Sequence, residues 1–212
     1  MILESRDLNK TTTTSLRLPR GLRAPDAIQR FLDDLLYNKE KGGETARSPR
    51  RILETREAHC FEGALLAAAA LRRLGYPPLV VQLRSTSRDD DHVLALFRER
   101  RGAGCWGSVA KSNYSGLRFR SPVYRSLREL VMSYFEAYYN LEGEKSLRAF
   151  ERPVDLARFD ARGWETAEES LWDVSTYLAT RRFTPLLTRA QVRALCPMDR
   201  RLYDAGLVGR VS

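Results

Sequence analysis

The chain is poor in the residues that build disulfide frameworks and metal centres. Its 212 residues include three cysteines and two histidines. An odd number of cysteines in a chain of this length does not make a disulfide framework, and a reducing compartment keeps them as thiols. The sequence has neither the paired-cysteine spacing of a zinc site nor a glycine-rich phosphate loop. We therefore expect no metal and no cofactor, and we consider each cysteine for reactivity or for packing.

Long apolar segments are also missing. No apolar run approaches the roughly 18 residues that indicate a membrane span. The first residues include Glu4 and Asp7 and lack the apolar core of a secretory signal. Apolar residues make up 43% of the chain and charged residues 30%, as in globular proteins. These features predict a cytoplasmic protein with no membrane partner.

Lysine is scarce although the net charge is +9, because five of the 36 basic residues are lysine and the rest are arginine. The arginines lie singly or in pairs along the whole chain. The densest cluster, Arg47 to Arg56, is interrupted by Glu54. A nucleic-acid partner would be indicated by a concentrated basic patch, so this distribution disfavours one.

The pattern of apolar residues predicts an α+β fold in which a central helix bearing a cysteine packs on an antiparallel β-sheet, with additional flanking helices. Residues 1–23 are expected to form an N-terminal arm, and residues 24–212 a single domain. Within that domain the core spans about residues 48–140, and residues 141–212 are expected to form a helical C-terminal extension, with a short edge strand at Phe150 to Val154. The strands expected in the core cover residues 79–83, 92–97, 105–111 and 117–120.

Cys60 is the candidate nucleophile, because it stands directly before the alanine-rich helical run from Ala64 to Leu71. The free N–H groups and the dipole of a helix N-terminus stabilise a thiolate and lower the pKa of a cysteine there. The same N–H groups can hold the oxyanion of a tetrahedral intermediate. Cys105 and Cys196 lack this context and are interpreted as small packing residues.

His92 is the candidate general base. It opens an expected strand after an acidic loop, where its side chain can face the helix that begins near Cys60. His59 is adjacent to Cys60, but neighbours at a helix entrance generally point in different directions. A structural, hydrogen-bonded role for His92 is the competing interpretation.

The expected hairpin narrows the choice of a third residue that orients the imidazole. With the turn centred between Gly102 and Ala103, the residue opposite His92 lies near position 113, and a one-residue shift moves it to 111. The carbonyl of Asn113 can accept the imidazole N–H, the hydroxyl of Ser112 can do so more weakly, and a lysine cannot accept. Asn113 is therefore the first choice and Ser112 the second.

These residues resemble the core of the transglutaminase-like superfamily, which shares the papain-like fold, and are similar to a bacterial branch of it. The resemblance covers about residues 48–140. It implies a thiol nucleophile at Cys60 and a base at His92. The family's third residue is an aspartate four positions after a tryptophan, and Ala110 stands at that position here. The motifs that carry the resemblance are Cys60-Phe61-Glu62-Gly63-Ala64, Asp91-His92-Val93 and the stretch from Trp106 to Asn113.

Two functions are consistent with the sequence. In the first, the protein is a thiol-dependent amide hydrolase or acyltransferase acting on a peptide or protein, through Cys60, His92 and Asn113. In the second, it is a catalytically inactive transglutaminase-like binding module. Its basic face, formed by Arg118, Arg120 and the Arg47 to Arg56 cluster, would then hold an acidic protein or nucleic acid.

Overall fold

The computed structural model describes residues 15–100 and 102–211. Residues 1–14, which hold most of the expected N-terminal arm, lie outside the described residues. The strands are β1 (Leu36–Tyr37), β2 (Glu57–Ala58), β3 (Leu79–Arg84), β4 (His92–Arg98), β5 (Trp106–Val109), β6 (Arg120–Tyr124), β7 (Ala149–Glu151), β8 (Val154–Asp155) and β9 (Phe183–Pro185). The α-helices are α1 (Pro25–Asp33), α2 (Pro49–Thr55), α3 (Cys60–Arg73), α4 (Leu127–Met132), α5 (Trp172–Ala179), α6 (Arg189–Arg193) and α7 (Arg200–Gly206). The 3-10 helices are η1 (Ser115–Leu117), η2 (Phe135–Ala137) and η3 (Leu156–Arg162).

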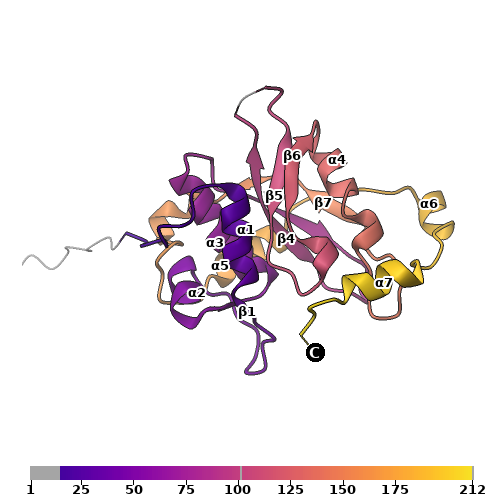
Figure 1. Ribbon diagram of the computed structural model, residues 1–212, viewed down its shortest axis with the longest axis horizontal. Coiled ribbons are helices and arrows are strands. Elements are labelled where there is room, and N and C mark those ends of the chain that lie inside the picture. Colours follow the sequence, from indigo (N-terminus) through magenta and orange to yellow (C-terminus); the bar gives the residue numbers. More distant parts are fainter. Residues whose placement is uncertain (1–14, 101, 212) are drawn as a thin grey trace, which may run out of the picture.

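The main sheet has seven strands, in the order β6-β5-β4-β3-β7-β9, with β8 also paired to β3. Each of its strand pairs is antiparallel. Figure 1 shows α1, α2 and α3 on one side of this sheet, and α4 near β6 and β7. The predicted α+β class, an antiparallel sheet with flanking helices, is confirmed. No helix of the described part of the chain is long and apolar enough to cross a membrane.

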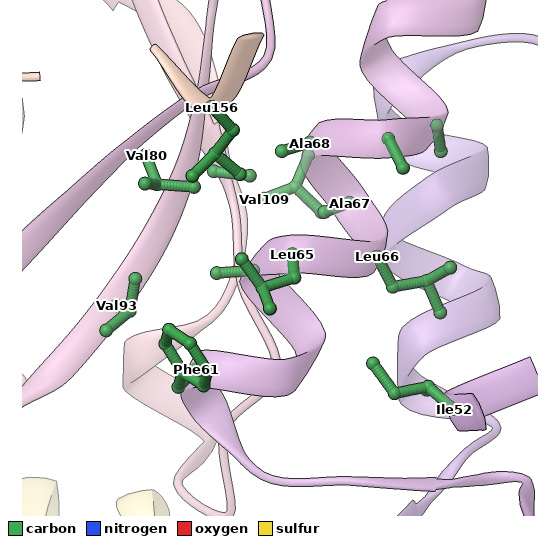
Figure 2. Close-up of a cluster of buried hydrophobic side chains, with 14 of the residues drawn as sticks. Ile52, Phe61, Leu65, Leu66, Ala67, Ala68, Val80, Val93, Val109 and Leu156 are labelled. Atoms are coloured by element: carbon green, nitrogen blue, oxygen red, sulfur yellow. The ribbon is translucent and has the colours of Figure 1, made fainter. Parts of the chain in front are cut away.

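Helix α3 is the centre of the larger core. Every residue from Phe61 to Leu71 is buried, because alanines and leucines occupy all of its sides. Small side chains let strands and helices approach the helix axis closely. In Figure 2, Leu66 faces Ile52 of α2, whereas Phe61 and Leu65 lie on the side of the sheet. The apolar residues on the sheet side are Val80, Val93, Val109 and Leu156.

Strands β4 and β5 form the predicted hairpin, with Ala95 opposite Val109. Continued beyond the end of β5, this register would set residue 112 opposite His92, one residue from the first choice. The ladder ends earlier for a reason in the sequence of α1. The side chain of Gln29 accepts from the backbone N of Ala110 at 3.0 Å and donates to its carbonyl at 2.9 Å. These backbone groups are thereby satisfied by a side chain, and the chain leaves the sheet after Val109.

The segment after residue 140 supplies three strands as well as helices, and β7 and β8 lie where a short strand was predicted, at Phe150 to Val154. Strand β7 pairs with β3 through Leu83 and Phe150, and β8 pairs with β3 through Val80 and Val154. Strand β9 then pairs with β7 at the edge. A buried β3 with one open edge would leave backbone N–H and C=O groups without partners, and these later strands satisfy them.

Candidate active site

Cys60 is the first residue of α3, and its local sequence explains why the helix begins there. His59 has extended backbone angles, with φ −94° and ψ −172°, and serves as the N-cap. Its backbone N–H donates to a carboxylate oxygen of Glu62 at 3.3 Å. Cys60 opens onto a cavity of about 400 Å³. Its other walls come from the segment before α2, the acidic loop before β4 and the tyrosine-rich segments, and include Tyr37, Asn38, Glu40, Asp89, Asp90, His92, Ser112, Tyr114, Leu117, Tyr138 and Tyr139.

His92 lies in the wall of this cavity, with 4% of its surface exposed. Its Nε2 atom is 2.9 Å from the carbonyl oxygen of Leu117. A carbonyl oxygen only accepts, so Nε2 carries the hydrogen and Nδ1 is the ring nitrogen left for Cys60. The Tyr138 ring packs edge-on against the imidazole, with ring centroids 6.4 Å apart. The structure therefore brings His92 and Cys60 to one cavity.

His59, which was expected to point away from Cys60, contributes a second imidazole to it. Its Nε2 atom lies 3.1 Å from the carbonyl oxygen of Thr45, and the carboxylates of Glu40 and Glu62 lie 3.6 and 3.7 Å away. The extended backbone of an N-cap residue lets its side chain fold back over the first turn. Its position as the residue before a helix is the signal in the sequence that could have indicated His59 as a partner of Cys60.

The two imidazoles change the acidity of the thiol. Burial raises the pKa of Cys60, but hydrogen bonds and charge from His59 and His92 outweigh it and lower that pKa from 9.0 to about 6. Burial lowers the pKa of His59, but the hydrogen bond with Cys60 and the negative charges of Cys60, Glu62 and Glu40 raise it to about 9. Between these values the pair is a thiolate beside an imidazolium.

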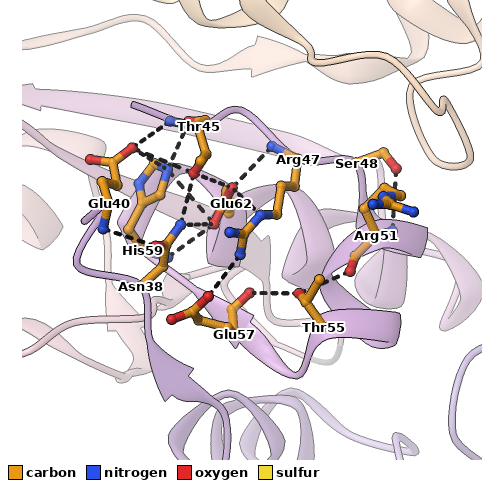
Figure 3. Close-up of polar contacts among 10 residues, drawn as sticks. All are labelled: Asn38, Glu40, Thr45, Arg47, Ser48, Arg51, Thr55, Glu57, His59 and Glu62. Atoms are coloured by element: carbon orange, nitrogen blue, oxygen red, sulfur yellow. Dashed lines mark hydrogen bonds and ion pairs between the residues drawn. The ribbon is translucent and has the colours of Figure 1, made fainter. Parts of the chain in front are cut away.

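Glu62 fixes the chain around His59 (Figure 3). Its side chain is fully buried and accepts from the side chain of Asn38 at 3.2 Å, from the hydroxyl of Thr45 at 2.8 Å and from the backbone N of Arg47 at 3.0 Å. Each of these bonds is to a charged acceptor and is stronger than a neutral one. Glu62 thus ties the segment from Asn38 to Arg47 to the first turn of α3.

The acidic loop before β4 is fixed by its own hydrogen bonds. The carboxylate of Asp91 accepts from the backbone N of Ser85 at 2.8 Å and from the side chain of Gln82 at 2.7 Å. Its backbone carbonyl lies 3.7 Å from the Cys60 sulfur, and the neighbouring carbonyl of Asp90 accepts from a tyrosine hydroxyl at 2.8 Å. Across residues 15–100 and 102–211, no group of three or more histidine, cysteine or acidic residues is arranged to hold a metal ion.

Asn113, the expected third residue, is placed elsewhere. Its amide nitrogen donates to the carbonyl of Val211 at 3.0 Å, and its amide oxygen accepts from the backbone N of Val211 at 2.8 Å. The expected contact with His92 is corrected accordingly, because both polar groups of Asn113 are used on the C-terminal segment. Ser112 lines the cavity, but its hydroxyl accepts from the backbone N of Tyr114 at 3.0 Å. The Leu117 carbonyl has the orienting position, which sequence spacing could not indicate.

The arginines of the expected basic face are engaged within the molecule. Arg118 lies 3.2 Å from the carboxylate of Asp33, and Arg120 donates to the hydroxyl of Ser133 at 3.0 Å. These guanidinium groups are thus paired within the molecule, while 43% of the Arg118 side chain stays exposed. The cluster before β2 is similarly paired with acidic residues: Arg47 with Glu57 and Glu62, and Arg50 and Arg51 with Glu54 and Glu168.

The chain was also compared with known proteins. No protein-family model matches it, and no curated protein matches its sequence.

Proposed function

We propose that the protein is a thiol-dependent amide hydrolase or acyltransferase that acts on an amide of a peptide or protein. One observation carries the proposal: the Cys60 thiol stands at the start of α3, in an open cavity, beside two imidazoles that are each anchored at Nε2 by a backbone carbonyl. The resemblance of the motifs around Cys60 and His92 to the transglutaminase-like superfamily supports it.

In this mechanism the Cys60 thiolate attacks the amide carbonyl carbon, and a C–S bond forms. The negative charge moves to the carbonyl oxygen, where the N–H groups at the start of α3 stabilise it. His92 binds a proton from solvent at Nδ1 and delivers it to the leaving amine as the C–N bond breaks. The resulting thioester passes its acyl group to water, which is hydrolysis, or to a second amine, which is acyl transfer. In the second half of the reaction Nδ1 takes a proton from the attacking water or second amine and returns it to solvent.

The two imidazoles have different tasks in this proposal. His59 is surrounded by the carbonyl of Thr45 and two carboxylates, so it is suited to remain charged and to stabilise the thiolate. His92 faces a neutral carbonyl at Nε2, which leaves Nδ1 as the ring nitrogen that carries the proton to the leaving amine in this proposal. The Leu117 carbonyl orients His92, a role that a side chain has in a Cys-His-Asn site.

The experiment is to trap the acyl-enzyme. The protein is incubated with a peptide library and examined by mass spectrometry before hydroxylamine is added. Hydroxylamine then converts thioesters to hydroxamates, and the peptides are examined by mass spectrometry. We expect an acyl adduct on Cys60 and peptide hydroxamates, and neither with Cys60→Ser.

The other two thiols supply the matched controls. Cys105→Ser and Cys196→Ser should leave adduct and hydroxamate unchanged, since neither residue lines the cavity. The proposal fails if iodoacetamide labels Cys60 no faster than Cys105 and Cys196 between pH 6 and 8 and no acyl adduct forms.

A further inference from the structure

A second cavity, of about 740 Å³, lies between the end of α5 and the edge strand β9. It shares no lining residue with the cavity of Cys60. Three of its lining residues are arginines, and none of those described is acidic. The lining comprises Arg152, Arg181 and Arg182 together with Tyr177, Thr180, Phe183, Thr184 and Pro185.

Packing fixes one part of the wall of this cavity. The Nη1 atom of Arg181 donates to the hydroxyl of Tyr177 at 3.0 Å. The guanidinium of Arg84 stacks over the Phe183 ring at 3.5 Å and donates to the carbonyl of Ala179 at 2.9 Å. A ligand that binds here meets the Arg181 and Phe183 side chains already held in place, which reduces the entropy lost on binding. The side chains of Arg152 and Arg182 are exposed and have no such contact among the described residues.

Positive charge in this cavity exceeds the negative charge that reaches it. Glu151, which is fully buried and pairs with Phe183 across β7 and β9, has one carboxylate oxygen 3.8 Å from Nε of Arg181. That separation is too long for a hydrogen bond, and Nε of Arg181 has no hydrogen-bond partner within the described residues. Arg152 and Arg182 form no ion pair with any described acidic residue. Two guanidinium groups and part of a third are therefore available to an anion.

We propose that this cavity binds a compact ligand carrying two or more oxyanion groups of the phosphate or carboxylate kind. Guanidinium groups match both oxyanions because their planar fork of donors forms paired, charge-assisted hydrogen bonds. The hydroxyl of Thr184 adds a further donor at the rim. Ligand sites commonly occupy about 300–1,000 Å³, so this cavity has room for more than one such group.

A small ligand fits the cavity better than nucleic acid does. Bases are held by stacking on free aromatic faces. Here the rings already carry guanidinium groups, Arg84 on Phe183 and Arg158 on Tyr177, the latter at 4.2 Å. The arginines also meet in one hollow instead of following a strip along the surface.

The test is calorimetric titration with two probes, tripolyphosphate and tricarballylate, at constant ionic strength. We expect at least one probe to bind, and Arg152→Ala combined with Arg182→Ala to weaken it by roughly tenfold or more. The control is Arg189→Ala combined with Arg193→Ala, which removes the same charge from exposed positions of α6 outside the cavity and should change affinity less than about twofold. Tighter binding of one probe identifies the ligand as phosphate- or carboxylate-bearing.

Three results would overturn the proposal: no binding of either probe, equal weakening by the two double variants, or binding of single-stranded oligonucleotide in preference to both probes. Thermal unfolding of each variant verifies that it is folded. The titrations are repeated with Cys60→Ser, in which the affinity should be unchanged, because this site does not depend on thiol chemistry.

Discussion

His92 and Leu117 are joined by a 2.9 Å hydrogen bond from the imidazole Nε2 to the backbone carbonyl. A carbonyl fixes the tautomer and the ring orientation, but it has no charge with which to stabilise an imidazolium. The carboxylates of Glu40 and Glu62 lie within 3.7 Å of Nε2 of His59, whereas the acidic loop that lines the same cavity places no described carboxylate within ion-pair distance of His92. The two histidines therefore differ electrostatically although both lie beside one thiol.

The first prediction concerns thiol reactivity. Because the pKa of Cys60 is lowered to about 6, its iodoacetamide alkylation rate should reach half of its maximum near pH 6, instead of near the ordinary value of 9.0. Rates are measured by mass spectrometry from pH 4.5 to 10, with Cys196 as the exposed internal reference. A midpoint at pH 8 or above for Cys60 would contradict the geometry.

The pH dependence of the free energy of unfolding should not reveal the shifted pKa values of Cys60 and His59. Folding lowers the pKa of Cys60 from 9.0 to about 6 and raises that of His59 from 6.5 to about 9. Between about pH 6.5 and 9 the folded state has its proton on His59, and the unfolded state has its proton on the thiol. Both states bind one proton, so the contributions cancel in the slope of unfolding free energy against pH. The pH dependence of Cys60 alkylation is therefore the measurement that shows on which of the two groups the proton lies.

The second prediction separates the roles of the two histidines. His59→Gln removes a cation and should raise the midpoint of Cys60 alkylation by about one to two pH units. Per thiolate, the rate of acyl transfer should change little. His92→Gln should reduce the rate per thiolate by about 10² to 10⁴, because the proton donor to the leaving amine is lost. The alkylation curve of each variant gives its thiolate fraction. If His59→Gln instead lowers the rate per thiolate and His92→Gln only shifts the midpoint, the roles of the two histidines are exchanged.

The third prediction concerns Asn113. Asn113→Ala removes both hydrogen bonds to Val211 and should increase amide hydrogen exchange in the segment after α7. The midpoint of Cys60 alkylation should remain that of the unchanged protein. If Asn113→Ala instead shifts this midpoint or lowers the rate per thiolate as His92→Gln does, Asn113 orients His92 in solution, as its position in the sequence suggests.

The sequence predicts the parts of the site that depend on local pattern. The helix that starts at Cys60 and the hairpin that begins at His92 follow from apolar periodicity and turn residues. The path after Val109 does not, because Gln29, 81 positions away, binds the backbone of Ala110. That long-range contact ends the ladder after Val109, so that Asn113 lies away from His92. The spacing of residues within the hairpin carries no information about a contact with Gln29.

The fourth prediction concerns Glu62. Glu62→Ala leaves donors from Asn38, Thr45 and Arg47 without their acceptor in a buried place, and should lower the unfolding free energy by about 3 kcal/mol or more. Glu62→Gln keeps the shape and removes the charge. It should therefore cost less stability and raise the alkylation midpoint of Cys60, because His59 loses a stabilising carboxylate. Urea unfolding and alkylation of both variants test this, and an unchanged midpoint in Glu62→Gln would contradict it.

The last prediction concerns Glu151, whose pKa burial raises from 4.5 to about 7, against hydrogen bonding from Gln82 and the positive charges of Arg181 and Arg84. The folded state then binds more protons than the unfolded state between about pH 4.5 and 7, so Glu151 contributes stability that is lost as pH rises through this window.

In Glu151→Gln the side chain at this position cannot ionise, so the variant should not lose this stability as pH rises. Relative to the unchanged protein, its unfolding free energy should rise by an amount on the order of 1–3 kcal/mol between pH 4.5 and 8. Urea unfolding at both pH values measures the difference. Glu169→Gln, at a carboxylate with 76% of its side chain exposed, is the control and should show no such rise. The contrary outcome is the same difference in unfolding free energy between Glu151→Gln and the unchanged protein at both pH values. It would mean that Arg181 and Arg84 keep Glu151 ionised throughout, so that the charge of this carboxylate and of the arginine cavity does not change with pH.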